Sequence, residues 1–205
     1  MTKSFSDKDL LLIFIKNPVL GKVKTRLAKT VGKEKALKIY NLLLDHTLKL
    51  THSLPLTKYL FYDTHIQRND MWSDLHYQKF LQEGEDLGQR MYKAFLKGFN
   101  DAYSSIVIIG SDCRELHYDI LANAFEALKT SDVVIGPAKD GGYYLLGMKQ
   151  LIPSLFKNKS WSSPQVFNET MTDINLLNLR CHLLPVLSDI DTEDDLINHS
   201  KYFKE

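Results

Sequence analysis

Carboxylates that could bind a metal ion occur at two places far apart in the sequence. Asp112 follows the apolar run 106–109, and Asp189 and Asp191 lie in an acidic stretch near the C-terminus. A carboxylate just after a buried strand can hold Mg²⁺ or Mn²⁺ against phosphate oxygens. Asp189 and Asp191 share a face in extended backbone, and we favour Asp191 as the second metal ligand. The alternative for Asp112 is that it only caps the following helix.

A basic loop follows the first apolar run. It leaves the run 10–15 at Lys16, contains Gly21, and reaches a helix start near Lys24 and Arg26. A glycine lets backbone N–H groups approach an anion, the helix N-terminus adds its dipole, and the two cations supply charge-assisted donors. The spacing is not that of a Walker A loop. We predict a polyphosphate site, although a solvated surface loop has the same composition.

A glycine-rich turn is the third candidate. Asp140 precedes Gly141 and Gly142, and Tyr143 opens the next apolar run. Such a sequence can be a simple hairpin turn. Beside a ligand crevice, Asp140 could instead bind a hydroxyl group or orient an acceptor, with Tyr143 stacking on it.

The elements that must position these residues alternate along the chain. Apolar runs predict strands at 10–15, 58–62, 77–81, 106–109, 133–135, 143–148 and 181–184, and helical spacing predicts helices at 33–51, 87–99, 117–129, 165–177 and from 193. This alternation predicts an α/β fold with a mostly parallel, mixed central sheet flanked by helices. Ligands of such sheets bind beyond the carboxyl ends of the strands, where all three candidates fall.

Composition limits the possible partners. The 205 residues include 26 Lys and Arg and 25 Asp and Glu, so no net charge attracts a nucleic acid polymer or a membrane. Two cysteines are too few for a disulfide framework, and the run 10–15 is too short for a signal peptide or a membrane span. We therefore expect a cytoplasmic protein with a single domain over residues 1–205.

Five ordered segments resemble a known family. They are Phe14-Ile15-Lys16-x-Pro18-x-x-Gly21-x-Val23-Lys24-Thr25-Arg26-Leu27, Gly84-x-Asp86-Leu87-Gly88-x-Arg90-Met91, Gly110-x-Asp112-Cys113, Gly136-Pro137-Ala138-x-Asp140-Gly141-Gly142-Tyr143-Tyr144-Leu145 and Asp189-Ile190-Asp191-Thr192-x-x-Asp195-Leu196. Together they resemble the bacterial DUF2064 family, described as glycosyltransferases and linked to arsenosugar biosynthesis. More distantly, the chain is similar to molybdenum cofactor and phospholactate nucleotidyltransferases, which share a GT-A-like fold.

The resemblance implies a GT-A-like nucleotide-diphospho-sugar transferase fold and a set of site residues. Nucleotide phosphates would be bound by the basic loop, namely Lys16, Gly21, Lys24, Thr25 and Arg26. The metal would bind Asp112 and Asp191, and the acceptor would face Asp140, Gly141, Gly142 and Tyr143. We assign the catalytic roles to Asp112, Asp140 and Lys24. The family usually has proline where this chain has Arg114, which either changes the turn that aims Asp112 or adds a phosphate contact.

The function expected from these residues is metal-dependent glycosyl transfer from a nucleotide-sugar to a small-molecule acceptor. The strongly basic loop would also suit a nucleoside triphosphate, and the chain would then be a nucleotidyltransferase that releases pyrophosphate. A third possibility is a nucleotide-binding protein without catalytic activity.

Overall fold

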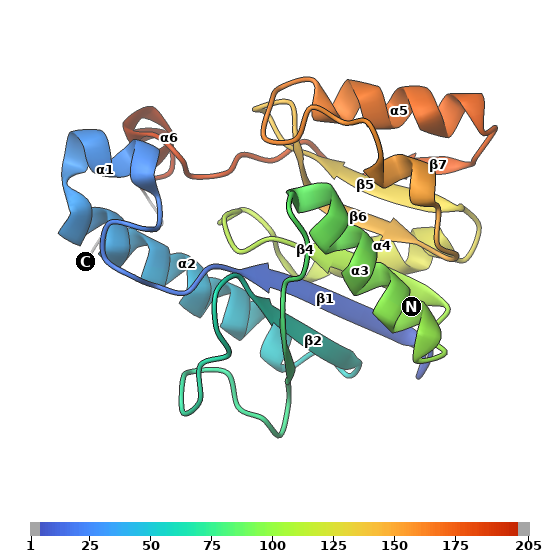
Figure 1. The fold of residues 1–205 in the computed structure, drawn as a ribbon, viewed down its shortest axis with the longest axis horizontal. Helices are drawn as coiled ribbons and strands as arrows, with labels where there is room; N and C mark the ends of the chain where they lie inside the picture. Colours follow the sequence, from blue (N-terminus) through green and yellow to red (C-terminus); the bar gives the residue numbers. More distant parts are fainter. Residues whose placement is uncertain (1–4, 201–205) are drawn as a thin grey trace.

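The computed structural model describes residues 5–200, which form a seven-stranded mixed sheet with helices on both faces (Figure 1). The strands are β1 (Asp9–Ile15), β2 (Thr57–Tyr62), β3 (Gln78–Leu81), β4 (Ser105–Ile109), β5 (Val133–Pro137), β6 (Tyr143–Met148) and β7 (Cys181–Leu183). Their order is β3-β2-β1-β4-β6-β5-β7, and β6 is antiparallel to both of its neighbours. The remaining pairs are parallel, so the predicted mostly parallel, mixed sheet is confirmed.

The helices lie close to their predicted positions. They are α1 (Thr25–Val31), α2 (Lys33–His52), α3 (Leu87–Asn100), α4 (Tyr118–Leu128), the 3₁₀ helix η1 (Pro153–Phe156), α5 (Val166–Leu176) and α6 (Glu193–Asn198). The sequence indicated α1 only as a helix start and did not indicate η1, because neither is long enough to show a repeating apolar face. Within residues 5–200, none of the helices is long and apolar enough to span a membrane.

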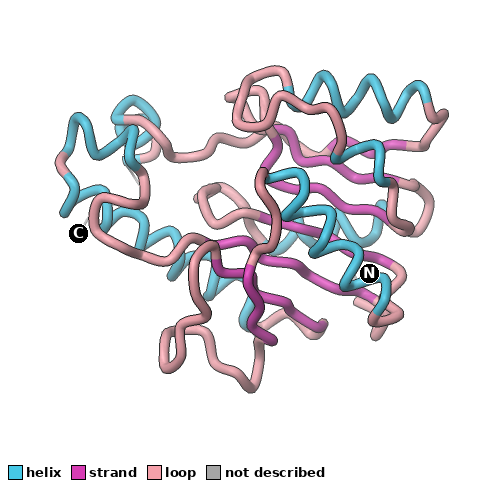
Figure 2. Tube along the Cα trace, viewed as in Figure 1, coloured by secondary structure: helices cyan, strands magenta, loops and turns pink. Residues whose placement is uncertain are grey.

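The central strand β1 is buried on both faces, which explains its continuous apolar run. Leu11 and Ile13 belong to the apolar core that includes side chains of α2 and α4. Leu10 and Leu12 point to the other face, into the core formed with α3, η1 and α5. Figures 1 and 2 show β1 running between these layers, with its carboxyl end directed toward the loop that leads to α1.

The segment that follows β7 crosses from one side of the fold to the other. Leu187 pairs with Ala138 beside the end of β5, and further along the Ile190 N–H donates to the Asp112 carbonyl oxygen at 3.2 Å. Ile190 is fully buried in a small apolar cluster with Leu27 of α1 and Leu43 of α2. These contacts bring the acidic C-terminal stretch to the carboxyl edge of the sheet, next to α1 (Figure 1).

Candidate active site at the carboxyl edge of the sheet

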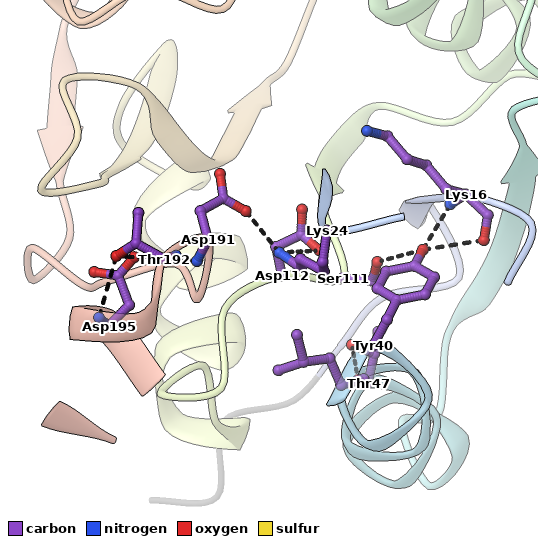
Figure 3. Close-up of polar contacts among 10 residues, drawn as sticks. Lys16, Lys24, Tyr40, Thr47, Ser111, Asp112, Asp191, Thr192 and Asp195 are labelled. Carbon is purple, nitrogen blue, oxygen red and sulfur yellow. Dashed lines mark hydrogen bonds and ion pairs between the residues drawn. The ribbon is translucent and has the colours of Figure 1, made fainter. Parts of the chain in front are cut away.

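A lysine held between two carboxylates forms the centre of the site (Figure 3). The Lys24 Nζ lies 2.9 Å from Asp112 Oδ1 and 2.8 Å from Asp191 Oδ1. The Lys24 side chain is only 3% exposed, whereas those of Asp112 and Asp191 are 41% and 40% exposed. The structure therefore brings the two distant carboxylates to one cation, and both remain accessible from solvent.

Charges in this cluster shift one another's pKa values. Burial alone would lower the pKa of Lys24, but Asp112 and Asp191 reverse this effect and raise it. Burial alone would raise the pKa of Asp191, but the Lys24 ammonium holds it below its ordinary value. For Asp189, burial and then repulsion from Asp112 outweigh the attraction of Lys24 and raise the pKa to about 7. The cluster thus has more carboxylates than its single ammonium neutralises.

The backbone around Lys24 aims its side chain inward. Lys24 is the residue before α1 and has left-handed backbone angles, with φ 47°. Its neighbours Val23 and Leu27 are buried at 2% and 0% exposure and anchor the turn on both sides. Left-handed angles are uncommon for residues other than glycine and cluster at functional sites, where packing maintains them.

A capping box holds Asp191 in place. The Thr192 hydroxyl accepts from the Asp195 N–H, and Asp195 Oδ2 accepts from the N–H groups of Thr192 at 2.8 Å and Asp191 at 3.1 Å. This is a variant of the capping box, with Asp195 in place of the usual Glu or Gln. The Asp195 carboxylate thus belongs to the N-terminal cap of α6 and also holds the backbone of Asp191.

Replacing Asp195 with alanine should therefore weaken both the fold and the site. We expect a loss of about 1 kcal/mol in the free energy of unfolding, the usual cost of losing a helix cap, and a several-fold lower transfer rate as Asp191 loses its backbone anchor. Urea unfolding and initial rates measure the two effects. Asp194→Ala removes an exposed acid from the same turn and serves as the control. Equal effects of the two substitutions would contradict this role of Asp195.

Tyr40 connects the two strand ends on either side of the site. Its hydroxyl donates to the Lys16 carbonyl oxygen at 3.0 Å, accepts from the Lys16 N–H at 2.8 Å, and lies 3.3 Å from the Ser111 hydroxyl (Figure 3). Tyr40 lies within the predicted helix 33–51 and was not among the predicted site residues. The one available signal was that Tyr40 carries a hydroxyl group, because a buried tyrosine hydroxyl usually has a hydrogen-bond partner.

The site opens into a cavity with two adjoining compartments. The first has a volume of about 520 Å³ and is lined by Lys24, Asp112 and Asp191, by the basic residues Lys16 and Arg26, and by the segments 140–143 and 161–164 in part. The second has a volume of about 490 Å³ and is more apolar, with Phe14, Met91, Ile108 and Leu146 among its lining residues. Asp112 borders both compartments, so it lies where two ligands would meet.

Most of the predicted site residues line the first compartment. They are Lys16, Lys24, Thr25, Arg26, Asp112, Asp140, Gly142, Tyr143 and Asp191. Gly21 and Gly141 do not line it: Gly21 lies against Lys33, and Gly141 lies against the backbone of Pro164. Both glycines have positive φ angles, 75° and 87°, a conformation that glycine adopts without strain, and they shape the loops beside the cavity.

Two further residues have contacts that bear on their expected roles. Arg114 lines neither compartment, and its guanidinium donates to His46 Nδ1 on α2 at 2.8 Å. Tyr143 lines the cavity, but its hydroxyl is buried near Thr170 on α5, and burial raises the pKa of Tyr143. The hydroxyl of Tyr143 is therefore closed off from a ligand in the cavity.

Sequence analysis did not assign the segment 161–164 to the site. The Trp161 indole packs directly over Gly88 in the first turn of α3, where a Cβ would lie 2.3 Å from Trp161 Nε1. Trp161 itself, Ser162 and Ser163 line the first compartment. Because Gly88 has no side chain, the Trp161 indole can pack against α3 and form part of the cavity wall.

Gly88→Ala should displace this wall. We expect it to destabilise the fold by about 1–3 kcal/mol through overpacking, although alanine is the better helix former by about 1 kcal/mol, and to raise the KM of a substrate. In a Trp161→Ala background the clash is absent, so the same substitution should become neutral or stabilising. A double-mutant cycle of unfolding free energies measures this coupling, and additive effects would refute the contact.

Comparisons with known proteins agree with this architecture. The family model described as "Uncharacterized protein conserved in bacteria (DUF2064)" matches residues 47–163. The structure of a protein from Desulfovibrio desulfuricans G20, provisionally described as a nucleotide-diphospho-sugar transferase, is 32% identical, with a TM-score of 0.85 over 93% of this chain and 85% of that one. No protein with curated annotation matches the sequence.

Two more distant structures share the fold alone. The 2-C-methyl-D-erythritol 4-phosphate cytidylyltransferase from Thermus thermophilus is 12% identical, with a TM-score of 0.53 over 95% of this chain and 98% of that one. The manganese complex of Rv0371C from Mycobacterium tuberculosis H37Rv is 10% identical, with a TM-score of 0.51 over 92% and 96% of the two chains. The fold is thus that of nucleotide-diphospho-sugar transferases.

Proposed function

Because the chain belongs to the bacterial DUF2064 family and has a nucleotide-diphospho-sugar transferase fold, we propose that it is a metal-dependent glycosyltransferase. The donor is a nucleotide-sugar, and the acceptor is a small molecule. The observation that carries this proposal is the convergence of Asp112 and Asp191 on one cation, in the wall of a cavity that Lys16 and Arg26 also line.

The carboxylate pair is suited to Mg²⁺ or Mn²⁺. Both carboxylates already hold a cation at 2.8–2.9 Å, and both are partly open to the cavity. Within residues 5–200, no group of three or more His, Cys, Asp or Glu side chains is arranged as a complete metal cage. Mg²⁺ is typically held by one or two carboxylates together with substrate phosphates and water, which is the donor set that this site offers. When bound, the ion would offset negative charge on the diphosphate.

The other side chains bind and orient the substrates. Lys16 and Arg26 are exposed cations in the cavity wall, and they would bind the diphosphate oxygens that gain charge as the sugar departs. Asp140 stands in the same wall, where its carboxylate can accept a hydrogen bond from an acceptor hydroxyl group. Tyr143 lines the same wall, and its ring would stack on the acceptor.

A nucleotidyltransferase is the second candidate, and one observation favours it. The first compartment places the cations Lys16 and Arg26 beside a carboxylate pair that would hold a divalent ion, and a triphosphate would use both the cations and the ion. In that reaction the acceptor oxygen attacks the α-phosphorus of a nucleoside triphosphate, and pyrophosphate leaves. The catalytic side chains would be the same, so the released product separates the two reactions.

The test is binding followed by product analysis. Calorimetry with a panel of nucleotide-sugars and nucleoside triphosphates, with and without Mn²⁺, identifies the donor, and turnover with candidate acceptors identifies the leaving group. Release of a nucleoside diphosphate with transfer of the sugar supports the proposal. Release of pyrophosphate selects the second candidate. Nucleotide binding that is independent of metal and never followed by turnover would contradict both and indicate a binding protein.

A further inference from the structure

The cation between Asp112 and Asp191 is supplied by the protein itself. The Lys24 ammonium contacts both carboxylates, and its side chain is almost fully buried while theirs are partly exposed (Figure 3). A divalent ion bound by the same two carboxylates would need the position that the ammonium occupies. Two cations cannot share that position, because at about 3 Å their repulsion would exceed the gain from coordination.

We propose that Lys24 is an internal counter-ion that occupies the metal position in the free protein and is displaced when the metal ion binds. This inference rests on the proposed function, since it concerns the same metal site. Lys24 therefore has two positions: between the carboxylates in the free protein, and in the adjoining phosphate compartment when metal and donor are bound.

The surroundings of Lys24 allow such a movement. Its side chain is a flexible four-carbon stem with a compact charge, and Lys24 already forms part of the wall of the first compartment. That compartment contains the exposed cations Lys16 and Arg26, so without a bound anion the displaced ammonium would meet like charges. Donor phosphates would supply the negative charge that Lys24 gives up when it leaves Asp112 and Asp191.

Metal and nucleotide binding are consequently coupled. Mn²⁺ alone must displace Lys24 without giving it a new partner, so the free protein should bind Mn²⁺ weakly. A nucleoside diphosphate provides that partner and should raise the affinity for Mn²⁺, and by thermodynamic reciprocity Mn²⁺ should raise the affinity for the nucleotide by the same factor.

The test removes the competing cation. Mn²⁺ binding in the absence of nucleotide, measured by electron paramagnetic resonance and calorimetry, should be at least about 10-fold tighter in Lys24→Met than in the wild-type protein. Lys22→Met, which removes an exposed lysine two residues away, should bind Mn²⁺ like the wild type. A Lys24→Met protein that binds Mn²⁺ no more tightly than the wild type would overturn the proposal.

Stability measurements keep the test decisive if removal of Lys24 impairs folding. Lys24→Met and Lys24→Gln should melt at lower temperature than the wild type without metal, because Asp112 and Asp191 lose their counter-ion, and millimolar Mn²⁺ should restore more of the loss than it adds to the wild type. Variants that stay unfolded at every Mn²⁺ concentration would show that a metal ion cannot replace Lys24. None of these readouts requires turnover, so failure of the proposed reaction is seen separately in the product analysis.

Discussion

Asp112→Asn is expected to lower the transfer rate by about 10³-fold, the upper range for loss of one group that stabilises charge in a transition state. The substitution keeps the size of the side chain and removes the charge that faces both compartments. Lys24 keeps Asp191 as its partner, so the ammonium remains paired and the fold should persist. Initial rates under saturating donor and Mn²⁺ give the effect on kcat, and the thermal midpoint reports on folding.

A matched control separates this effect from a general loss of negative charge. Asp119 lies in the first turn of α4, its side chain is 77% exposed, and it does not line the cavity. Asp119→Asn should therefore keep the wild-type rate. The alternative that Asp112 only caps the following helix is wrong, because α4 begins at Tyr118 and its N-cap is His117. If Asp112→Asn were active at more than about a tenth of the wild-type rate, Asp112 would only pair with Lys24 and would have no part in the reaction.

The fold could be predicted from the sequence because its elements have strong local signals. The run 10–15 is apolar at every position, which only a strand covered on both faces requires. The helix α3 has buried Met91, Ala94 and Phe95 at helical spacing. The strand order, with β6 inserted antiparallel between β4 and β5, depends on contacts between distant segments and leaves no such local pattern.

The site was only partly predictable for the same reason. Asp112 and Asp191 could be proposed as a pair because Asp112 follows a recognisable strand and Asp191 precedes a recognisable helix start within a motif. The pairing of Lys24 with both could not be predicted, since it depends on a left-handed backbone at Lys24 and on the packing of Ile190 against Leu27. Trp161 lies in an irregular segment, and its place in the cavity wall depends on the space above Gly88, which no local pattern indicates.

Asp189→Asn should stabilise the metal-free protein most at pH 8, less at pH 5, and hardly at all below pH 3.8. In the folded protein the pKa of Asp189 is raised to about 7 from an ordinary value of 3.8, first by burial and then by repulsion from Asp112. Between these values the folded state binds a proton that the unfolded state has lost. The contribution of Asp189 to stability is therefore fully present below pH 3.8 and is lost as the pH rises through about 7.

The size of this effect follows from the two pKa values. A change from 3.8 to about 7 corresponds to roughly 4 kcal/mol. Because the Asp189 residue is partly open to solvent, we expect the variant to gain about 2 kcal/mol at pH 8. Urea unfolding of both proteins at several pH values measures the difference, with Asp194→Asn as an exposed control. A difference that stays constant with pH, or a variant that is less stable at pH 8, would contradict the assignment.

The same experiment repeated with Mn²⁺ connects Asp189 to the function of the site. Asp189 lies next to a carboxylate pair that one ammonium neutralises incompletely, so the folded protein carries an unfavourable negative charge above pH 7. A divalent ion on Asp112 and Asp191 would relieve this repulsion, and the advantage of Asp189→Asn at pH 8 should shrink when Mn²⁺ is added. The negative charge of Asp189 would then lower the stability of the metal-free protein and favour cation binding at the site. Active sites often keep groups that lower the stability of the free protein in this way.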